Sequence, residues 1–328
     1  MMCEYRSRCR STFDWRDDAQ NRAVVELVRT AAATLPHDPP PAAIPDCVRV
    51  AVGRLEQQAK EAHTTEPYDE RHLVQQAALV GALHSSGLLQ QASRTVFAEL
   101  GAGRGYLLHL LAHTCGPPGV NLLFVERRAY RFKAERSLRR TDGINAVRAR
   151  CDIADFDLAS AIMALFTNGT PPNRVVMVAK HLCGSATDMA LRCALRCSQR
   201  DGICLVGACL APCCHHSCTW STYVGKPYLR RFGVGKREFG IMCRLASWCV
   251  DAHGGSRPNG SDTLSRWGYS PQERAAIGTS VKRLLDEGRA QWLAAKLPSG
   301  NASVRIYVDD RVTPENRAVV WTPATSAS

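Results

Sequence analysis

The chain has 328 residues, of which 45% are hydrophobic and 22% charged, a composition that excludes an intrinsically disordered protein. Lysine and arginine outnumber aspartate and glutamate by 42 to 30, and the resulting formal charge of +12 favours a polyanionic partner without identifying one. No uncharged apolar run approaches the roughly 20 residues that span a bilayer, so we expect no membrane partner.

The fifteen cysteines would indicate a disulfide framework only in a short secreted chain. No apolar signal segment follows Met1, and Asp14 and Asp17 lie among the early arginines, which disfavours export and a mitochondrial presequence. We therefore expect reduced thiols and a cytoplasmic or nuclear protein.

Three helices are predicted before residue 85. Apolar residues recur at helical spacing over 14–35 and again after Asp46, which can cap a second helix. A third helix is expected over about 68–84. Residues 1–66 are interpreted as a helical N-terminal extension, and residues 67–328 as the catalytic domain.

From residue 95 short apolar strands alternate with helices, a pattern typical of a parallel sheet covered on both faces. The predicted strands are Val96–Leu100, Asn121–Val125, a third run before Asp152, Arg174–Ala179 and Ile203–Cys209, and the predicted helices between them include Arg104–His113 and Ala186–Cys197. After a loop over 250–268, a capping box opens a helix from Ser270 to Leu297, and Val304–Val308 pairs antiparallel with Ala318–Trp321. The fold class is α/β and Rossmann-like.

The strongest motif follows the first strand and opens a helix. It contains Glu99, Gly101, Gly103 and Gly105, and glycines at such a turn let the backbone approach a bulky ligand. The glycine spacing differs from that of dinucleotide-binding enzymes. Glu99 would repel a pyrophosphate but attract an ammonium group, which favours S-adenosylmethionine (SAM) over NAD.

Two further acids follow neighbouring strands. Glu126 ends the second strand, where a carboxylate can accept the hydroxyls of a ribose. Asp152 follows the third strand and could receive the adenine amine, although a solvated strand-end carboxylate is an equal reading. The sequence thus predicts a class I SAM-dependent methyltransferase.

Candidate catalytic groups follow the fourth and fifth strands. Lys180 and His181 come after the fourth predicted strand, and His215 and His216 come after the fifth. Open α/β sheets place reacting groups at these strand ends. These side chains could orient and deprotonate a ribose hydroxyl. Alternatively, Cys213 could supply a thiolate that attacks a cytosine ring, and spacing alone does not decide between them.

Zinc is a third reading of the segment Cys213–Cys218. Its cysteines and histidines are nearly contiguous and lack the spread of structural zinc sites, since adjacent residues rarely reach one tetrahedral ion. We therefore expect no metal. Some of these cysteines are expected to be packing groups.

Taken together, the motifs closely resemble the Trm13-type tRNA 2′-O-methyltransferases over about residues 66–321. The matching segments are 71–77, the glycine turn 99–105, Val125–Arg127 with Arg131–Lys133, Lys180–Asp188, Cys213–Trp220 with Tyr223–Lys226, Arg244–Trp248 and the helix from Ser270 to Gly288.

The resemblance implies SAM as methyl donor, tRNA as partner, and the ribose 2′-hydroxyl at position 4 of the acceptor stem as acceptor. Family members commonly carry small zinc-binding modules before the catalytic domain. Only Cys3, Cys9, His37 and Cys47 precede residue 60, and no such finger is evident. The rival functions are an RNA cytosine-5 methyltransferase that uses Cys213 and a tRNA-binding protein without catalysis. No protein partner, oligomeric state or tRNA identity can be inferred.

Overall fold

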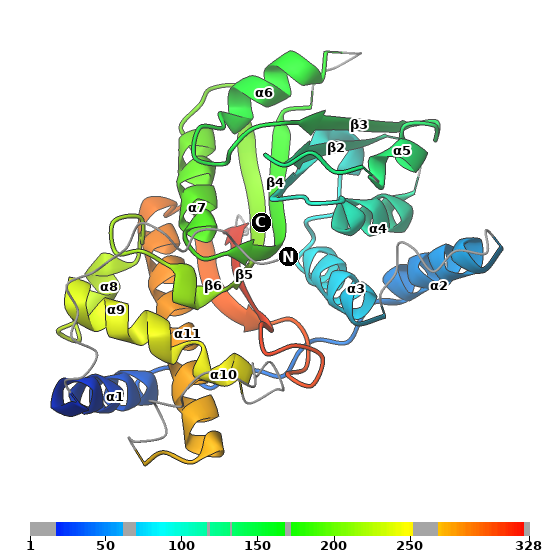
Figure 1. The fold of residues 1–328 in the computed structure, drawn as a ribbon. Helices are drawn as coiled ribbons and strands as arrows, with labels where there is room; N and C mark the ends of the chain where they lie inside the picture. Colours follow the sequence, from blue (N-terminus) through cyan, green and yellow to red (C-terminus); the bar gives the residue numbers. More distant parts are fainter. Residues whose placement is uncertain are drawn as a thin grey trace.

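The computed structural model describes residues 18–61, 70–116, 119–131, 133–167, 172–251 and 268–324. Within these ranges the chain forms a seven-stranded sheet in the order β3-β2-β1-β4-β5-β7-β6 (Figure 1). The strands are β1 (Thr95–Leu100), β2 (Val120–Val125), β3 (Ile144–Ala149), β4 (Arg174–Cys183), β5 (Cys204–Cys213), β6 (Gly300–Ile306) and β7 (Arg317–Pro323).

The first five strands are parallel, whereas β7 pairs antiparallel with both β5 and β6. The predicted Rossmann-like sheet with a closing antiparallel pair is therefore confirmed. The strand order reverses between β1 and β4, so the carboxyl ends of these two strands form the kind of switch point at which open α/β sheets bind their ligands.

Helices cover both faces of the sheet. They are α1 (Asp18–Ala33), α2 (Asp46–Glu61), α3 (Glu70–Ser85), α4 (Tyr106–Cys115), α5 (Glu135–Leu138), α6 (Leu158–Leu165), α7 (Ser185–Ser198), α8 (Lys226–Arg230), α9 (Lys236–Leu245), α10 (Trp248–Asp251) and α11 (Pro271–Lys296). Short 3₁₀ turns lie at Ala92–Arg94 and His215–Ser217. None of the helices in the described ranges combines the length and apolar character that a membrane crossing requires.

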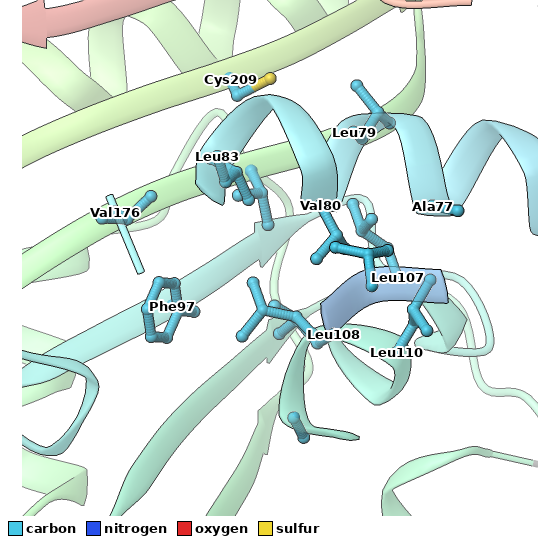
Figure 2. Packing of buried hydrophobic residues seen from close by; sticks show 14 of the residues in the cluster. Ala77, Leu79, Val80, Leu83, Phe97, Leu107, Leu108, Leu110, Val176 and Cys209 are labelled. Carbon is cyan, nitrogen blue, oxygen red and sulfur yellow. The ribbon is translucent and has the colours of Figure 1, made fainter. Parts of the chain in front are cut away.

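Alternate residues of the central strands point to opposite faces and build two cores. Phe97 packs with α2, α3 and α4, whereas Val96 and Ala98 pack with α6, α7 and α11. Figure 2 shows the first core, in which Leu79, Val80 and Leu83 of α3 lie beside Leu107 and Leu108 of α4. Helices α2, α3 and α4 are thus packed together against this face of the sheet.

A third apolar cluster groups α1, α8 and α9 around α11, as Figure 1 shows. Helix α11 begins with the predicted capping box, in which the Ser270 hydroxyl accepts the amide of Glu273 and the Glu273 carboxylate accepts the amide of Ser270. Helices α8 and α9 were not predicted. The predicted loop over 250–268 falls largely on residues 252–267, which lie outside the described residues.

The boundaries of four elements differ from the sequence prediction. Strands β4 and β5 continue to Cys183 and Cys213, four residues beyond the predicted ends, because the two pair with each other along that length. Helix α4 begins at Tyr106, since Gly105 has a left-handed conformation. Strand β6 begins at Gly300 and ends at Ile306, because its first residues extend the ladder to the end of β7.

Candidate active site

The turn between β1 and α4 has the open backbone that ligand approach requires. Gly103 has a φ of +51°, and a Cβ placed on it would meet no atom within 4 Å. Gly105 has a φ of +85°, and close packing also requires glycine here, because a Cβ would lie 2.7 Å from the Phe124 ring. Gly101 lies against Leu182 of β4, which a Cβ would approach to 3.1 Å. The turn therefore adjoins the Lys180 segment.

Glu99 lies buried at the end of β1, with 4% of its surface exposed. Its Oε2 atom accepts a long hydrogen bond of 3.5 Å from the amide of Leu108 in α4. Burial raises the pKa of the Glu99 carboxyl to about 8, against the lowering effects of that amide and of the Arg148 and Lys180 charges. This carboxyl group is therefore poised to ionise when a cation comes beside it.

Glu126 lies at the matching end of β2 and ties the turn to the following loop. Its Oε2 accepts the amide of Gly103 at 3.0 Å, and its Oε1 accepts the amide of Arg128 at 2.8 Å. Glu99 and Glu126 thus flank the glycine turn on adjacent strands, as the sequence places them.

Asp152 follows β3 and is more open than Glu99 and Glu126, with 40% of its side chain exposed. It accepts the Arg127 guanidinium at 3.3 Å and the amide of Ala154 at 3.1 Å. These contacts hold the carboxylate at the β3 end of the strand edge that carries Glu126.

Arg148 holds the backbone of the glycine turn in place, and it was not identified as a site residue from the sequence. Its guanidinium pairs with both carboxylate oxygens of Glu135, donates to the Gly103 carbonyl at 3.0 Å, and lies 5.3 Å from the centre of the Phe124 ring. This paired and half-buried cation fixes the backbone where a ligand would approach.

The structure adds two residues of α3 to the predicted pair Lys180 and His181, which lies near the end of β4. Lys180 Nζ lies 2.8 Å from Nδ1 of His72, and His181 Nε2 lies 2.7 Å from Oε1 of Gln75. The imidazole rings of His72 and His181 meet edge to face with centres 5.8 Å apart. A helix about 100 residues earlier in the chain therefore completes this part of the site.

His181 has an unusual backbone, because its φ of +57° lies in the left-handed region. The β4–β5 register shifts between Lys180 and Leu182, so the strand bulges at this residue. Burial, together with the charges of Lys180 and His72, lowers the pKa of His181 to about 4. The ring is therefore neutral at pH 7, and since the amide oxygen of Gln75 only accepts, Nε2 carries the hydrogen and Nδ1 the lone pair.

His215 and His216 have different surroundings. His215 is buried, and its Nε2 lies 2.9 Å from Asp286 of α11. Asp286 also accepts Arg289, which in turn pairs with Asp188 of α7. His216 is exposed. The structure thus places His215 in a buried charge network rather than beside His72 and Lys180.

The cysteines after β4 and β5 lie close together. Cys213 is 5% exposed, and its sulfur lies 3.2 Å from that of Cys183. Cys218 accepts a contact from Arg289 at 3.2 Å and belongs to the buried charge network. Cys183 was not counted among the metal candidates in the sequence.

A basic and aromatic surface follows the β5 loop. The Lys226 and Arg230 cations lie 5.8 and 5.9 Å from the Trp220 ring centre, and Arg231 lies 5.7 Å from that of Tyr228. We name this the α8–α9 surface and define it by Trp220, Lys226, Tyr228, Arg230, Arg231, Lys236 and Arg237.

Comparison with known proteins finds a family. The family model "Methyltransferase TRM13" matches residues 74–322. Two relatives, the tRNA:m(4)X modification enzyme TRM13 homologs of Mus musculus and Homo sapiens, are each 29% identical over 79% of this chain. The chain spans 65% and 66% of their lengths.

Among solved structures, the SAH-bound methyltransferase PaMTH1 of Podospora anserina covers 96% of this chain and 99% of its own. It is 8% identical with a TM-score of 0.36, a similarity too low to support an inference about this site.

Proposed function

This chain belongs to the TRM13 methyltransferase family, and we propose that it transfers a methyl group from SAM to the ribose 2′-hydroxyl at position 4 of the tRNA acceptor stem. The observation that carries the proposal is the family match over residues 74–322, which contains the glycine turn and the Lys180 and Cys213 segments. The mouse and human relatives are named as tRNA:m(4)X modification enzymes, which supports tRNA as the substrate.

The residues around the glycine turn fit SAM. Gly103 leaves room for a ligand, and the buried Glu99 carboxyl offers an anion for an ammonium group. We assign Glu126 to the ribose hydroxyls and Asp152 to the adenine amine, with Gly101 and Gly105 shaping the turn. When bound, SAM supplies an electrophilic methyl group, and the chain's own residues must align the acceptor oxygen and remove its proton.

We assign the proton removal to Lys180 and His72. The form that takes the proton is the neutral amine of Lys180, which donates one hydrogen to Nδ1 of His72, 2.8 Å away, and keeps its own lone pair for the hydroxyl proton. The register of β1 with β4 brings this pair to the same strand edge as Glu99. His181 is neutral, and its Nδ1 can accept a hydrogen bond that orients the ribose hydroxyl.

The two remaining histidines receive different roles. Because His215 is engaged by Asp286 inside the protein, we assign it to holding the β5 loop on α11 rather than to proton transfer. His216 is exposed, and it is a candidate for contacting the substrate next to Lys180 and His181.

Neither rival function matches the geometry as well. A cytosine-5 enzyme needs an accessible thiolate, but Cys213 is buried with its sulfur against Cys183. A binding protein without catalysis has no use for the open glycine turn or for the Lys180–His72 contact.

Capture of tRNA is assigned to the α8–α9 surface. Residues 226–245 contain six lysines and arginines and a single acid, Glu238, and most of these basic side chains are exposed. Cations beside Trp220 and Tyr228 suit phosphates and stacked bases. The protein would act in the cytoplasm or nucleus, where tRNA is processed.

The direct test uses radiolabelled SAM and two tRNA transcripts that differ in one atom. We expect label in the transcript with an ordinary ribose at position 4 and none in the matched transcript with 2′-deoxyribose there. Equal labelling of both transcripts would refute the assigned acceptor.

A further inference from the structure

Three cysteine sulfurs form a cluster at the ends of two neighbouring strands. The thiols of Cys183, Cys213 and Cys214 all lie within 4.8 Å of one another, and we name them the sulfur cluster. Cys183 and Cys213 are register partners on β4 and β5, with their sulfurs 3.2 Å apart. This set differs from the contiguous segment that the sequence suggested.

An irregular backbone brings the third sulfur in. Consecutive residues of a strand point to opposite faces, so Cys213 and Cys214 could not reach one point in regular β structure. Cys214, however, has a φ of +49°, a left-handed conformation that residues other than glycine rarely adopt. This turn breaks the alternation and places both sulfurs beside that of Cys183.

We propose that the sulfur cluster binds one Zn²⁺ ion through three thiolates. Zinc–sulfur bonds of about 2.3 Å place the thiolates of a tetrahedral site roughly 3.8 Å apart, and the sulfur atoms, all within 4.8 Å of one another, need to move together by about an ångström or less to reach it. Soft thiolate ligands favour zinc over magnesium or calcium.

The burial of the three residues fits an ion with one open position. Cys213 is buried, Cys214 is half-buried and Cys183 is exposed, so an ion can enter from the solvent side and retain a water as its fourth ligand. Two of the remaining candidates of the segment are engaged elsewhere, since His215 contacts Asp286 and Cys218 contacts Arg289.

The ion would join the carboxyl ends of β4 and β5. These ends carry Lys180 and His181 on one strand and precede His216 on the other. A zinc ion here would fix the relative position of the two catalytic loops. The inference is independent of the proposed function, because metal binding is measured without any methyl acceptor.

The test uses the full chain purified under reducing conditions without chelator. We expect about one zinc per chain by elemental mass spectrometry, and after its removal we expect titration with Co²⁺ to produce sulfur-to-cobalt charge-transfer absorption and the visible bands of a tetrahedral ion. Cys183→Ser and Cys214→Ser should each lose most of the zinc and the charge-transfer band. The matched control Cys204→Ser, an exposed cysteine at the opposite end of β5, should keep both.

Circular dichroism confirms that each variant is folded, and the exposed position of Cys183 makes its serine variant the safer one. A wild-type chain that takes up neither zinc nor Co²⁺ would overturn the proposal, as would zinc content unchanged in both cluster variants. A Cys183–Cys213 disulfide, seen as the loss of two hydrogens in the intact mass of the unreduced chain, would assign the cluster to thiol oxidation instead.

Discussion

Glu99→Gln separates the cofactor contact from the packing of β1. The substitution keeps the size of the side chain but removes its ionisation. The folded chain raises the pKa of this carboxyl from 4.5 to about 8, so it favours the neutral acid. The contribution of the neutral Glu99 carboxyl to the stability of the fold is fully present below pH 4.5 and is lost as the pH rises through 8.

The size of the effect follows from the shift. At 1.36 kcal/mol per pKa unit, the wild-type carboxylate costs folding about 3 kcal/mol at pH 7 and about 5 kcal/mol above pH 8. Without SAM, the Gln variant should therefore unfold at a higher temperature than wild type at pH 8. At pH 4 the two should unfold alike.

Binding of SAM should show the opposite preference. Because the ammonium group requires the ionised carboxylate, the affinity of wild type should rise roughly tenfold per pH unit between about pH 6 and pH 8. Calorimetry in buffers of different ionisation enthalpy should detect release of the Glu99 proton. The Gln variant should bind SAM weakly at every pH.

The matched ligand control is methylthioadenosine, which lacks the amino-acid part of SAM. Wild type and Glu99→Gln should bind it equally. A wild-type SAM affinity that does not change with pH, or a Gln variant that keeps full affinity, would refute the assignment of Glu99 to the ammonium group.

Four further substitutions probe the rest of the site. Lys180→Ala and His72→Ala should each lower kcat by about 10²- to 10⁴-fold with a much smaller change in the SAM Kd, and single-turnover methylation measures this. A loss confined to SAM binding would contradict their role. Arg230→Glu on the α8–α9 surface should weaken tRNA binding and reduce the salt dependence of that binding, whereas Arg305→Glu on the edge strand β6 should change neither. Filter binding at several salt concentrations measures both quantities. Equal losses in the two variants would contradict the assignment of tRNA binding to the α8–α9 surface. Asp286→Ala should lower the free energy of unfolding in urea by about 1–3 kcal/mol, because His215 and Arg289 each lose a buried hydrogen-bond acceptor, and an unchanged free energy would contradict the network.

The fold was largely predictable because its signals are local. Apolar runs of strand length, the glycine turn and the Ser270 capping box each depend on a few neighbouring residues. The helices α8 and α9 were not recognised, because Lys226 to Leu245 mixes basic residues and glycines with short apolar stretches. Their positions depend on packing against α11.

The site was only partly predictable. Lys180 and His181 could be singled out because they follow the predicted strand Arg174–Ala179, but His72 and Gln75 lie on the helix predicted over 68–84, for which the sequence indicated no part in the site. The one available signal was the segment 71–77, which resembles the family without showing a role. The contacts of Lys180 with His72 and of His181 with Gln75 join residues about 100 positions apart in the sequence, so they form only when the chain folds.

The segment Cys213–Cys218 was also only partly predictable from the sequence. His215 and His216 are adjacent in sequence, yet one is buried against Asp286 and the other is exposed. Charge partners on α11 decide this, and they lie about 70 residues later. Likewise Cys183 joins Cys213 through strand register, which residue spacing does not report.

Mass spectrometry of the nucleosides and of nuclease fragments from tRNA incubated with this protein and SAM tests the central claim most directly. We predict a single new 2′-O-methylated nucleoside, mapped to position 4 of the acceptor stem. A methyl group found on a base, or a sugar methylated at another position, would contradict the proposed function.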